Sequence, residues 1–312
     1  LVRALVSTGT KVRVLLRDQH SPGFDGLAVE RMTVNILDPV ALINAFAGAD
    51  IVYHCDSICT FLTFNYPKMF KHNVRGTEAV IQACRVAHVR RLVYLASYLV
   101  FGSEGFSNSI IESSGFRPQK ATSYYGKTKA IAAQRVARAT HKGLETVILC
   151  PGVVVGPYDY DFSIVGKLIW DFGRGRLPVD CHGGLDFVDS RDLAKACIWA
   201  GEKAASGSVY LVTGYHQSIE RLMRNLQLIT GHRRPWAHVP RWMMYVIGMA
   251  YELRAVITQR HPIYTRVTTV MVRKNHRSVS TRLRDDMGFA PTPIAQTLRD
   301  TWAWHREHHH YF

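Results

Sequence analysis

Short apolar runs rich in β-branched residues recur along the first two thirds of the chain. They lie at 11–16, 49–55, 90–97, 144–150 and 207–213. Runs of this length predict strands that are buried on both faces. Helical periodicity fills most of the gaps, at 38–48 with Asp38 as N-cap, 66–87, 121–140 and 189–204. Strands that alternate with helices predict right-handed βαβ units and an α/β fold with a parallel, doubly wound sheet.

The alternation stops after residue 213. The remaining hundred residues predict helices joined by short irregular links. We therefore expect the C-terminal third to be mainly helical and to differ in architecture from the sheet.

The start of the chain is unusual for such a sheet. Residues 1–16 predict the later part of a helix, a turn at Gly9 and then a strand. A nucleotide-binding sheet of this type normally begins with a strand and a glycine-rich turn, because bare backbone N–H groups must approach the phosphates at the helix N-terminus. Neither precedes this helix, and residue 1 is Leu. We expect the first strand and its glycine-rich loop to be missing from the 312 residues.

Composition indicates a globular protein without a membrane-spanning helix. Hydrophobic residues make up 47% of the chain, but the longest apolar run, 242–251, is about half the roughly 20 residues that a span needs. The six cysteines are scattered, and Cys55 and Cys59 lack the spacing of a zinc site. We expect reduced, buried thiols, a cytoplasmic location and no metal site, with the terminal histidines forming a solvated tail.

The formal charge of +15 is concentrated in one segment. Residues 216–285 hold 13 of the Lys and Arg residues against three acidic ones, without a zinc-finger spacing or an aromatic-interleaved basic repeat. We expect a basic solvated surface and no nucleic-acid partner. The sharper alternative is an anionic partner. This would be a phospholipid surface, which the protein contacts peripherally beside the apolar 242–251 segment, or a phosphorylated substrate.

The stretch S-Y-Y-G-K-T-K-A at 123–130 contains two possible Tyr/Lys pairs. A lone Y-x-x-x-K spacing is weak evidence, because 14 tyrosines in 312 residues make a chance pair common. The helix face is more informative. At about 100° per residue, Tyr125 shares a face with Lys129, Ala132, Ala133, Val136, Ala139 and Thr140. Lys127 falls opposite, with Gln134, Arg138 and His141. We therefore expect Tyr124 and Lys127 to face solvent, and Tyr125 and Lys129 to face inward.

An inward lysine one turn from an inward tyrosine has a chemical use. A cation within about 4–6 Å lowers the pKa of a phenol by roughly 1–3 units, which would fit Tyr125 for general acid or base catalysis. Ser97 follows the apolar run 90–97, at the carboxyl edge where open α/β sheets bind ligands. Its hydroxyl could hold the reacting oxygen.

These motifs together resemble a known family. The run V-Y-L-A-S-x-x-V-F-G at 93–102, the Y-Y-G-K-T-K-A stretch and P-G-V-V-V-G-P at 151–157 resemble the extended short-chain dehydrogenase/reductases, the NAD-dependent epimerase/dehydratase family. The resemblance implies a Rossmann domain at 1–155, to which 186–213 return. It also implies a smaller substrate domain at 156–185 and 214–312. Its catalytic set would be Ser97, Tyr125 and Lys129, with Asn73 matching the family's N-V-x-G-T motif.

The resemblance also suggests how a dinucleotide would be held. The expected cofactor-binding residues are Arg17, Asn35, Ile36, Lys129, Pro151 and Val153. NAD-preferring enzymes place an acidic residue at the position of Arg17, whereas a guanidinium suits the 2′-phosphate of NADP. NADP is therefore favoured, with NAD open because Asp18 is adjacent. Asp56 replaces a small residue of the family pattern and would crowd an anionic cofactor, unless it lies in a solvated loop.

The P-G-V-V-V-G-P stretch separates two branches of the family. Sugar-nucleotide epimerases carry an Asn where this chain has Val153. The stretch is more similar to dihydroflavonol reductases and 3β-hydroxysteroid dehydrogenases, which implies a ketone or aldehyde/alcohol oxidoreductase acting on an apolar small molecule. Trp242, Met243, Met244 and Tyr245 suit an apolar pocket or plain core. A sugar-nucleotide epimerase or dehydratase and a non-catalytic dinucleotide-binding protein remain alternatives, and a homodimer is an option.

Overall fold

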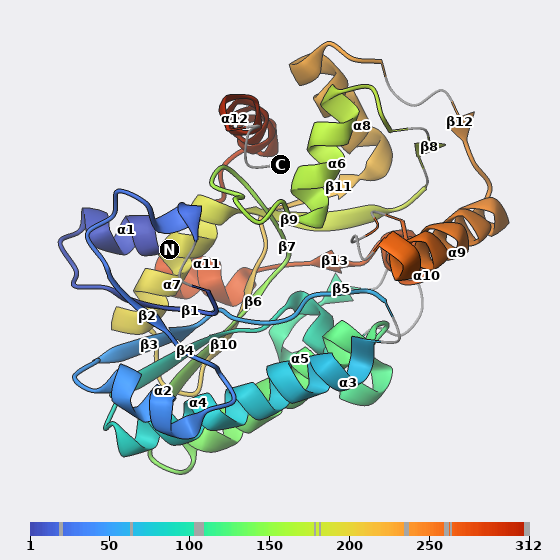
Figure 1. The fold of residues 1–312 in the computed structure, drawn as a ribbon. Helices are drawn as coiled ribbons and strands as arrows, with labels where there is room; N and C mark the ends of the chain where they lie inside the picture. Colours follow the sequence, from blue (N-terminus) through green and yellow to red (C-terminus); the bar gives the residue numbers. More distant parts are fainter. Residues whose placement is uncertain are drawn as a thin grey trace.

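Four parallel strands form the centre of the protein in a computed structural model (Figure 1). The model describes residues 1–18, 21–62, 65–102, 109–177, 179–180, 182–233, 237–258, 262 and 264–308. The strand order is β10 (Val209–Val212), β6 (Glu145–Pro151), β4 (Arg91–Leu95) and β3 (Ile51–His54). Three of them lie within predicted strands and β6 extends one residue beyond its predicted run, so the predicted parallel α/β sheet is confirmed.

A second parallel pair lies beside this sheet. It consists of β1 (Arg13–Leu16) and β2 (Glu30–Thr33). Within the described residues no strand pairs with both β1 and β3, and a cleft of about 1930 Å³ is lined by residues of both. The hydrophobic pattern does not predict β2, because its side chains are mostly exposed and do not alternate.

Helices cover both faces of the sheet (Figure 1). On one face lie α2 (Pro39–Phe46), α4 (Gly76–Val86) and α5 (Tyr124–Thr140), which share a core with β4 and β6. On the other lie α1 (Val2–Ser7), α7 (Ser190–Glu202) and α11 (Thr281–Met287). The predicted helix over 66–87 is present as α3 (Tyr66–Met69), a π-helical turn (Phe70–Arg75) and α4. Asp38 caps α2 as predicted.

The C-terminal part is mainly helical but also contains strands. Its helices are α6 (Ile164–Gly173), α8 (Ile219–Thr230), α9 (Arg241–Thr258), α10 (Arg266–Lys274) and α12 (Ile294–Glu307). A second sheet has the order β11 (Tyr215–Ser218), β9 (Gly184–Asp189) and β7 (Val153–Val155). Two short pairs complete the strands: β8 (Val179–Asp180) with β12 (Ala237–His238), and β5 (Ser109–Ile110) with β13 (Arg277–Ser278). The prediction of helices alone after residue 213 is thus incomplete.

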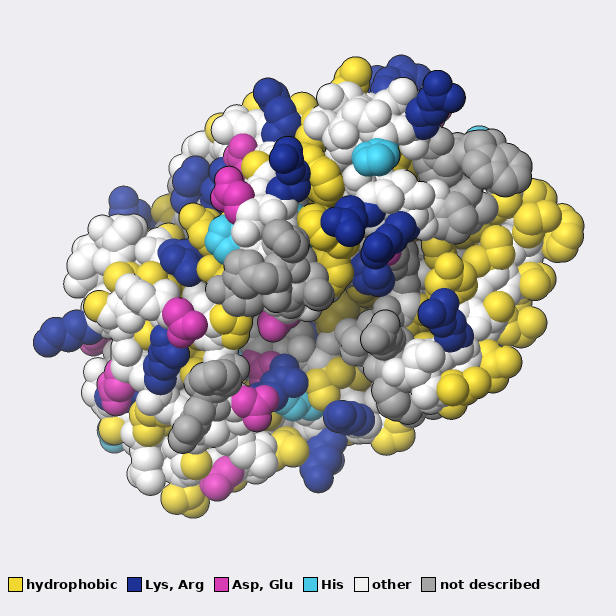
Figure 2. Space-filling view, turned by 45° about the horizontal axis from the view of Figure 1, so that its top comes forward, with side chains coloured by type: hydrophobic (Ala, Val, Ile, Leu, Met, Phe, Trp, Pro, Cys, Tyr) yellow, Lys and Arg dark blue, Asp and Glu magenta, His cyan; other side chains and the backbone are white. Residues whose placement is uncertain are grey.

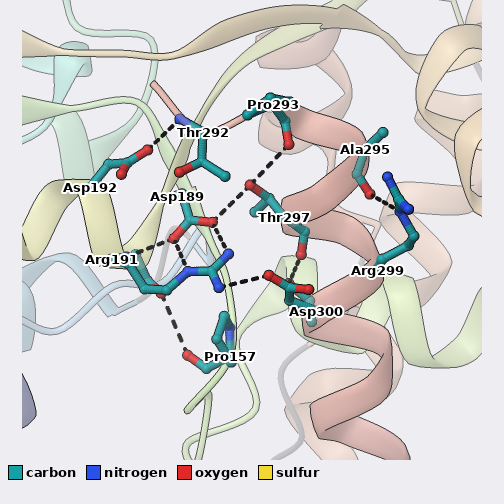
Figure 3. A network of polar contacts seen from close by, with 12 residues as sticks. Pro157, Asp189, Arg191, Asp192, Thr292, Pro293, Ala295, Thr297, Arg299 and Asp300 are labelled. Carbon is teal, nitrogen blue, oxygen red and sulfur yellow. Dashed lines mark hydrogen bonds and ion pairs between the residues drawn. The ribbon is translucent and has the colours of Figure 1, made fainter. Parts of the chain in front are cut away.

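The two parts are interleaved rather than simply consecutive. Leu283 and Phe289, which the sequence places in the smaller domain, pack into the core beneath α7. Figure 3 shows a polar network between the start of α7 and α12. The buried carboxylate of Asp189 accepts hydrogen bonds from Arg191 Nη2 at 2.7 Å and from Thr297 Oγ1 at 2.8 Å. Arg191 also pairs with Asp300 at 2.7 Å. This network fixes the last helix on the sheet.

The cysteines only partly follow the prediction. Cys84, Cys150 and Cys197 are buried free thiols, as expected. Cys55 and Cys59 are exposed free thiols, because they lie in the loop after β3 rather than in the strand. Cys181 lies outside the described residues.

Candidate functional site

Ser97 lies at the carboxyl edge of the sheet, as predicted. Strand β4 ends at Leu95, and Ser97 begins the 3₁₀ turn Tyr98–Phe101. Its Oγ accepts a hydrogen bond from Leu99 N at 3.3 Å, and the residue is buried. The hydroxyl hydrogen is therefore still available to donate to a ligand.

The start of α5 packs closely on this turn. Ser123 caps the helix by accepting a hydrogen bond from Gly126 N at 3.0 Å. A Cβ atom on Gly126 would lie 3.2 Å from Leu99 Cβ, so glycine lets the helix approach the turn. This close approach brings the first two turns of α5 beside Ser97.

Lys129 faces inward from the second turn of α5, which confirms the prediction. Only 2% of the residue is exposed, and its Nζ lies 4.4 Å from the centre of the Tyr94 ring. The ammonium donates a hydrogen bond to the carbonyl oxygen of Leu95 at 2.5 Å. Burial lowers the pKa of Lys129 to about 8. A buried cation of this kind is costly, so it points to a functional role.

Tyr125 is partly buried one turn before Lys129. Its ring meets that of Phe61 edge to face, with 6.2 Å between the centroids, and its hydroxyl interacts with Ser57 and Cys59. Burial raises the pKa of Tyr125 well above its ordinary value. The expected lowering of the Tyr125 pKa is therefore wrong for this geometry, because burial dominates the shift. Tyr124 is exposed, as predicted, and lies against Tyr66.

Asn73 connects the loop after β3 to α5. It lies in the π-helical turn, and its Oδ1 accepts a hydrogen bond from Ile58 N at 2.8 Å. Its Nδ2 donates to the Ile58 carbonyl at 3.0 Å and to Thr128 Oγ1 at 3.1 Å. The amide group is thus satisfied by the protein. Asn73 is suited to positioning Tyr125 and the 55–60 loop rather than to touching a substrate.

Arg17 and Asp56 form an ion pair at the edge of the large cleft. Arg17 Nη2 lies 2.9 Å from Asp56 Oδ1, and His72 Nε2 lies 2.8 Å from Asp56 Oδ2. Burial alone would raise the pKa of Asp56, but the hydrogen bond and charge of His72 and the charge of Arg17 lower it to about 2. Asp56 thus lies in the loop after β3 with its side chain 36% exposed, as the solvated alternative expects, and its charge is compensated by Arg17 and His72.

The remaining predicted cofactor residues are distributed around the same edge. Asn35 is exposed and accepts a hydrogen bond from Leu37 N at 3.0 Å, and Ile36 packs against Gly76. Pro151 ends β6, and Val153 begins β7. Arg17 and Ile36 line the large cleft, whereas Ser97, Tyr125 and Lys129 are not among its lining residues. The predicted set thus divides into two residues at the cleft, Arg17 and Ile36, and three residues away from it, Ser97, Tyr125 and Lys129. These three are expected from the sequence to be catalytic, and we call them the catalytic group.

A small cavity of about 20 Å³ lies next to the catalytic group. Its walls come from the turn after Ser97 and from α10, with Tyr98, Leu99, Ile110, Thr122, Met271 and Lys274 among its lining residues. Lys274 Nζ donates to Thr122 Oγ1 at 3.1 Å, and burial lowers the pKa of Lys274. The sequence does not predict Met271 or Lys274 at this site, because they are about 150 residues away from Tyr125.

His54 is a further residue that the sequence did not single out. It is buried beneath the catalytic group, with its ring centre 5.3 Å from that of Tyr94. Burial and the charge of Lys129 lower the pKa of His54 to about 3, so the imidazole is neutral at ordinary pH. Lys129 therefore lies over the uncharged ring of Tyr94, which in turn contacts the neutral ring of His54.

Known proteins resemble this chain over nearly its whole length. It is 33% identical over 312 residues to sterol demethylase protein B of Methylococcus capsulatus, covering 98% of this chain and 94% of that protein. It is 24% identical to a putative dihydroflavonol 4-reductase of Synechocystis, covering 99% of this chain and 91% of that protein. The solved structure of gox2253 is 27% identical, with a TM-score of 0.83 and coverage of 98% and 94%.

More distant structures share the fold alone. The UDP-glucose 4-epimerase of Thermotoga maritima superposes with a TM-score of 0.79 at 15% identity, covering 98% of this chain and 94% of that one. Residues 1–213 match the family described as NAD dependent epimerase/dehydratase. With that match and the 33% identical relative, the chain belongs to the NAD-dependent epimerase/dehydratase family.

Proposed function

We propose that this chain, an NAD(P)-dependent oxidoreductase of the epimerase/dehydratase family, interconverts a ketone and an alcohol on an apolar small molecule. The observation that carries the proposal is Lys129. A lysine that is 2% exposed beside the carboxyl end of β4 has no structural need to be charged, but it suits a reaction centre.

Each member of the catalytic group has a distinct role. In the reduction direction the phenol of Tyr125, whose raised pKa keeps it protonated, gives its proton to the carbonyl oxygen. Ser97 Oγ donates a hydrogen bond to the same oxygen, which orients the carbonyl and stabilises its developing charge. Lys129 supplies a nearby positive charge. The nicotinamide, when bound, supplies or accepts the hydride.

The residues of this chain fit part of a dinucleotide. Arg17, Asn35 and Ile36 would hold the adenosine end, and Lys129 would hydrogen-bond the ribose at the nicotinamide end. Arg17 supports NADP, since a guanidinium suits a 2′-phosphate. The ion pair with Asp56 opposes it, because the phosphate would have to compete with a carboxylate for the same cation.

The pyrophosphate of a dinucleotide would need a glycine-rich turn at a helix N-terminus, and among the described residues no such turn leads into α1. We propose that the cleft between β1 and β3 takes a parallel strand ending in a glycine-rich turn at the N-terminus of α1. Two observations support this placement: within the described residues β1 and β3 pair with β2 and β4 but not with each other, and the cleft beside them has a volume of 1930 Å³. The test is to express the reading frame extended upstream. A gain in dinucleotide affinity of less than tenfold over the 312-residue chain would contradict it.

The substrate is proposed to be a cyclic apolar alcohol or ketone of the steroid type. The supporting observations are the names of two relatives. One is the sterol demethylase protein, and the other is the 3β-hydroxysteroid-dehydrogenase/decarboxylase of Arabidopsis thaliana, which is 24% identical.

The proposal is tested by following the absorbance of reduced nicotinamide with a panel of steroid ketones and alcohols. Net substrate-dependent oxidation or reduction of the cofactor is expected. UDP-glucose and UDP-galactose serve as matched substrates for the alternative function. Interconversion of these sugars without net cofactor turnover would replace the proposal by an epimerase, and cofactor binding without either activity would indicate a non-catalytic protein.

A further inference from the structure

An apolar stripe lies on the outer surface of α9. It consists of seven exposed large side chains: Trp242, Tyr245, Val246, Met249, Leu253, Val256 and Ile257. At about 100° per residue these positions fall within an arc of roughly 120° on one face of the helix. Figure 2 shows hydrophobic side chains gathered over the right-hand side of the molecule, where α9 lies in Figure 1, with Lys and Arg side chains nearby.

The opposite face of α9 is the one that packs on the protein. Met244, Gly248 and Ala255 are buried there. A Cβ atom on Gly248 would lie 2.8 Å from Arg266 N, so the helix is pressed against the start of α10. Glu252 fixes this contact through an ion pair with Arg266 at 2.8 Å. The stripe therefore cannot be turned inward by a simple rotation of the helix.

The sequence allowed Trp242, Met243, Met244 and Tyr245 to be an apolar pocket or plain core, and for two of the four that interpretation is wrong. Of the residues named for it, Met244 is core, whereas Trp242 and Tyr245 are exposed. Scattered exposed apolar residues are normal, but a continuous stripe along 18 residues marks an interaction surface.

We propose that α9 lies flat in the headgroup region of an anionic phospholipid bilayer, with the stripe inserted. An in-plane amphipathic helix combines an apolar face with basic flanks, and Trp and Tyr favour the membrane interface. Residues 216–285, which include α8, α9, α10 and most of α11, carry 13 Lys and Arg against three acidic residues, and α9 itself carries Arg241 and Arg254 against Glu252. Basic residues near an anionic surface strengthen binding to it. No described helix is long and apolar enough to cross a membrane.

A second copy of the chain fits this surface less well. Two copies that joined their stripes would bring two strongly basic segments together, and like charges repel. An anionic bilayer offers negative charge to the basic residues and an apolar interior to the stripe.

The position of α9 also relates the apolar stripe to the candidate site. Helix α9 packs on α10, and α10 supplies Met271 and Lys274 to the small cavity next to Ser97 and Tyr125. A bilayer that contacts α9 would lie one helix layer from this cavity. An apolar substrate dissolved in the membrane would then have a short route to the site. The lipid contact does not depend on the proposed reaction and would hold for any substrate.

The test is co-sedimentation with vesicles of phosphatidylcholine containing phosphatidylglycerol, compared with vesicles of phosphatidylcholine alone. The unaltered protein is expected to bind the anionic vesicles, with a loss at high salt. The double variant Leu253→Ser/Ile257→Ser should bind at least tenfold more weakly. Both side chains are mostly exposed, at 66% and 78%, so the variant should keep its fold.

Leu228→Ser on α8 is the matched control, since Leu228 is 80% exposed but lies outside the stripe. It should bind vesicles like the unaltered protein. Circular dichroism checks the folding of all variants. Equal sedimentation of the double variant and the control would overturn the proposal, as would equal binding to neutral vesicles. Concentration-dependent dimerisation that the double variant alone abolishes, without vesicle binding, would assign the stripe to a second copy instead.

Discussion

The guanidinium of Arg17 and the carboxylate of Asp56 meet at 2.9 Å across the cleft between β1 and β3. Arg17 follows β1 and Asp56 follows β3, so the pair links the carboxyl ends of two strands that do not hydrogen-bond to each other. His72 approaches the other oxygen of Asp56 at 2.8 Å. Arg17, on which the expectation of NADP rests, is thus already held by a carboxylate.

This pair predicts how cofactor preference will respond to substitution. Replacing Asp56 by Asn should free Arg17 for a 2′-phosphate and raise the ratio of kcat/KM with NADP to kcat/KM with NAD, by about tenfold. Arg17→Ala should lower the same ratio. The measurement uses the upstream-extended protein proposed above, and Arg31→Ala on β2 is the control. An unchanged ratio in both variants would mean that Arg17 does not contact the cofactor.

Tyr125 and its neighbour Tyr124 provide a second prediction. Tyr125→Phe should lower kcat by about 10²–10⁴-fold, because the phenol that transfers the proton is lost. Cofactor binding, measured by nicotinamide fluorescence, should persist. Tyr124→Phe is the matched control, since Tyr124 is exposed on the solvent side of the same helix turn, and its kcat should stay within about twofold. Equal rates in the two variants would remove Tyr125 from the mechanism.

The buried ammonium of Lys129 is expected to lower the stability of the fold while being needed for turnover. Lys129→Met should abolish turnover but raise the free energy of unfolding at pH 7 by about 2 kcal/mol, because a buried ammonium is replaced by an apolar group of similar length. The folded-state pKa of about 8 lies below the ordinary 10.5, so between these values the folded state binds fewer protons. The stability contribution of Lys129 should therefore rise with pH across that window.

Chemical unfolding at several pH values measures this effect. The stability difference between Lys129→Met and the unaltered protein should shrink as the pH rises from 8 to 10.5. Lys127→Met, on the opposite face of the same helix where the lysine is not buried, is the control and should show no such change with pH. If Lys129→Met is less stable at pH 7 than the unaltered protein, the lysine has a structural role.

The buried carboxylate of Asp189 should make the contact between α7 and α12 sensitive to acid. Asp189→Ala should destabilise the fold by about 3 kcal/mol, because it leaves Arg191 and Thr297 without their shared buried acceptor. Burial would raise the pKa of Asp189, but hydrogen bonds from Arg191 and Thr297 lower it below 3.8. Its contribution is therefore present above the unfolded pKa and is lost as the pH falls through the folded value.

Thermal unfolding between neutral and acid pH checks this prediction. Asp300→Ala is the control, since Asp300 pairs with Arg191 but is 36% exposed and should cost less than about 1 kcal/mol. If the two variants lose the same stability, Asp189 does not hold α12 in place.

The sequence by itself determined most of the sheet and the orientation of α5. Buried parallel strands need long apolar runs, so β3, β4, β6 and β10 are visible in the pattern. The face of α5 could be assigned because helical periodicity places Tyr125 and Lys129 with alanines and Val136. Strand β2 was missed because an exposed edge strand needs no apolar alternation.

Only the tertiary structure decided which polar groups meet. Lys129 could be predicted to face inward, but not to bond Leu95 while Tyr125 turns to Ser57 and Cys59. The Arg17–Asp56 pair, and Lys274 beside Thr122, join residues that are 39 and 152 positions apart. The outward stripe of α9 likewise depends on which face α10 covers. Periodicity says that a helix has an apolar face, but only the packing of its neighbours decides whether protein covers that face.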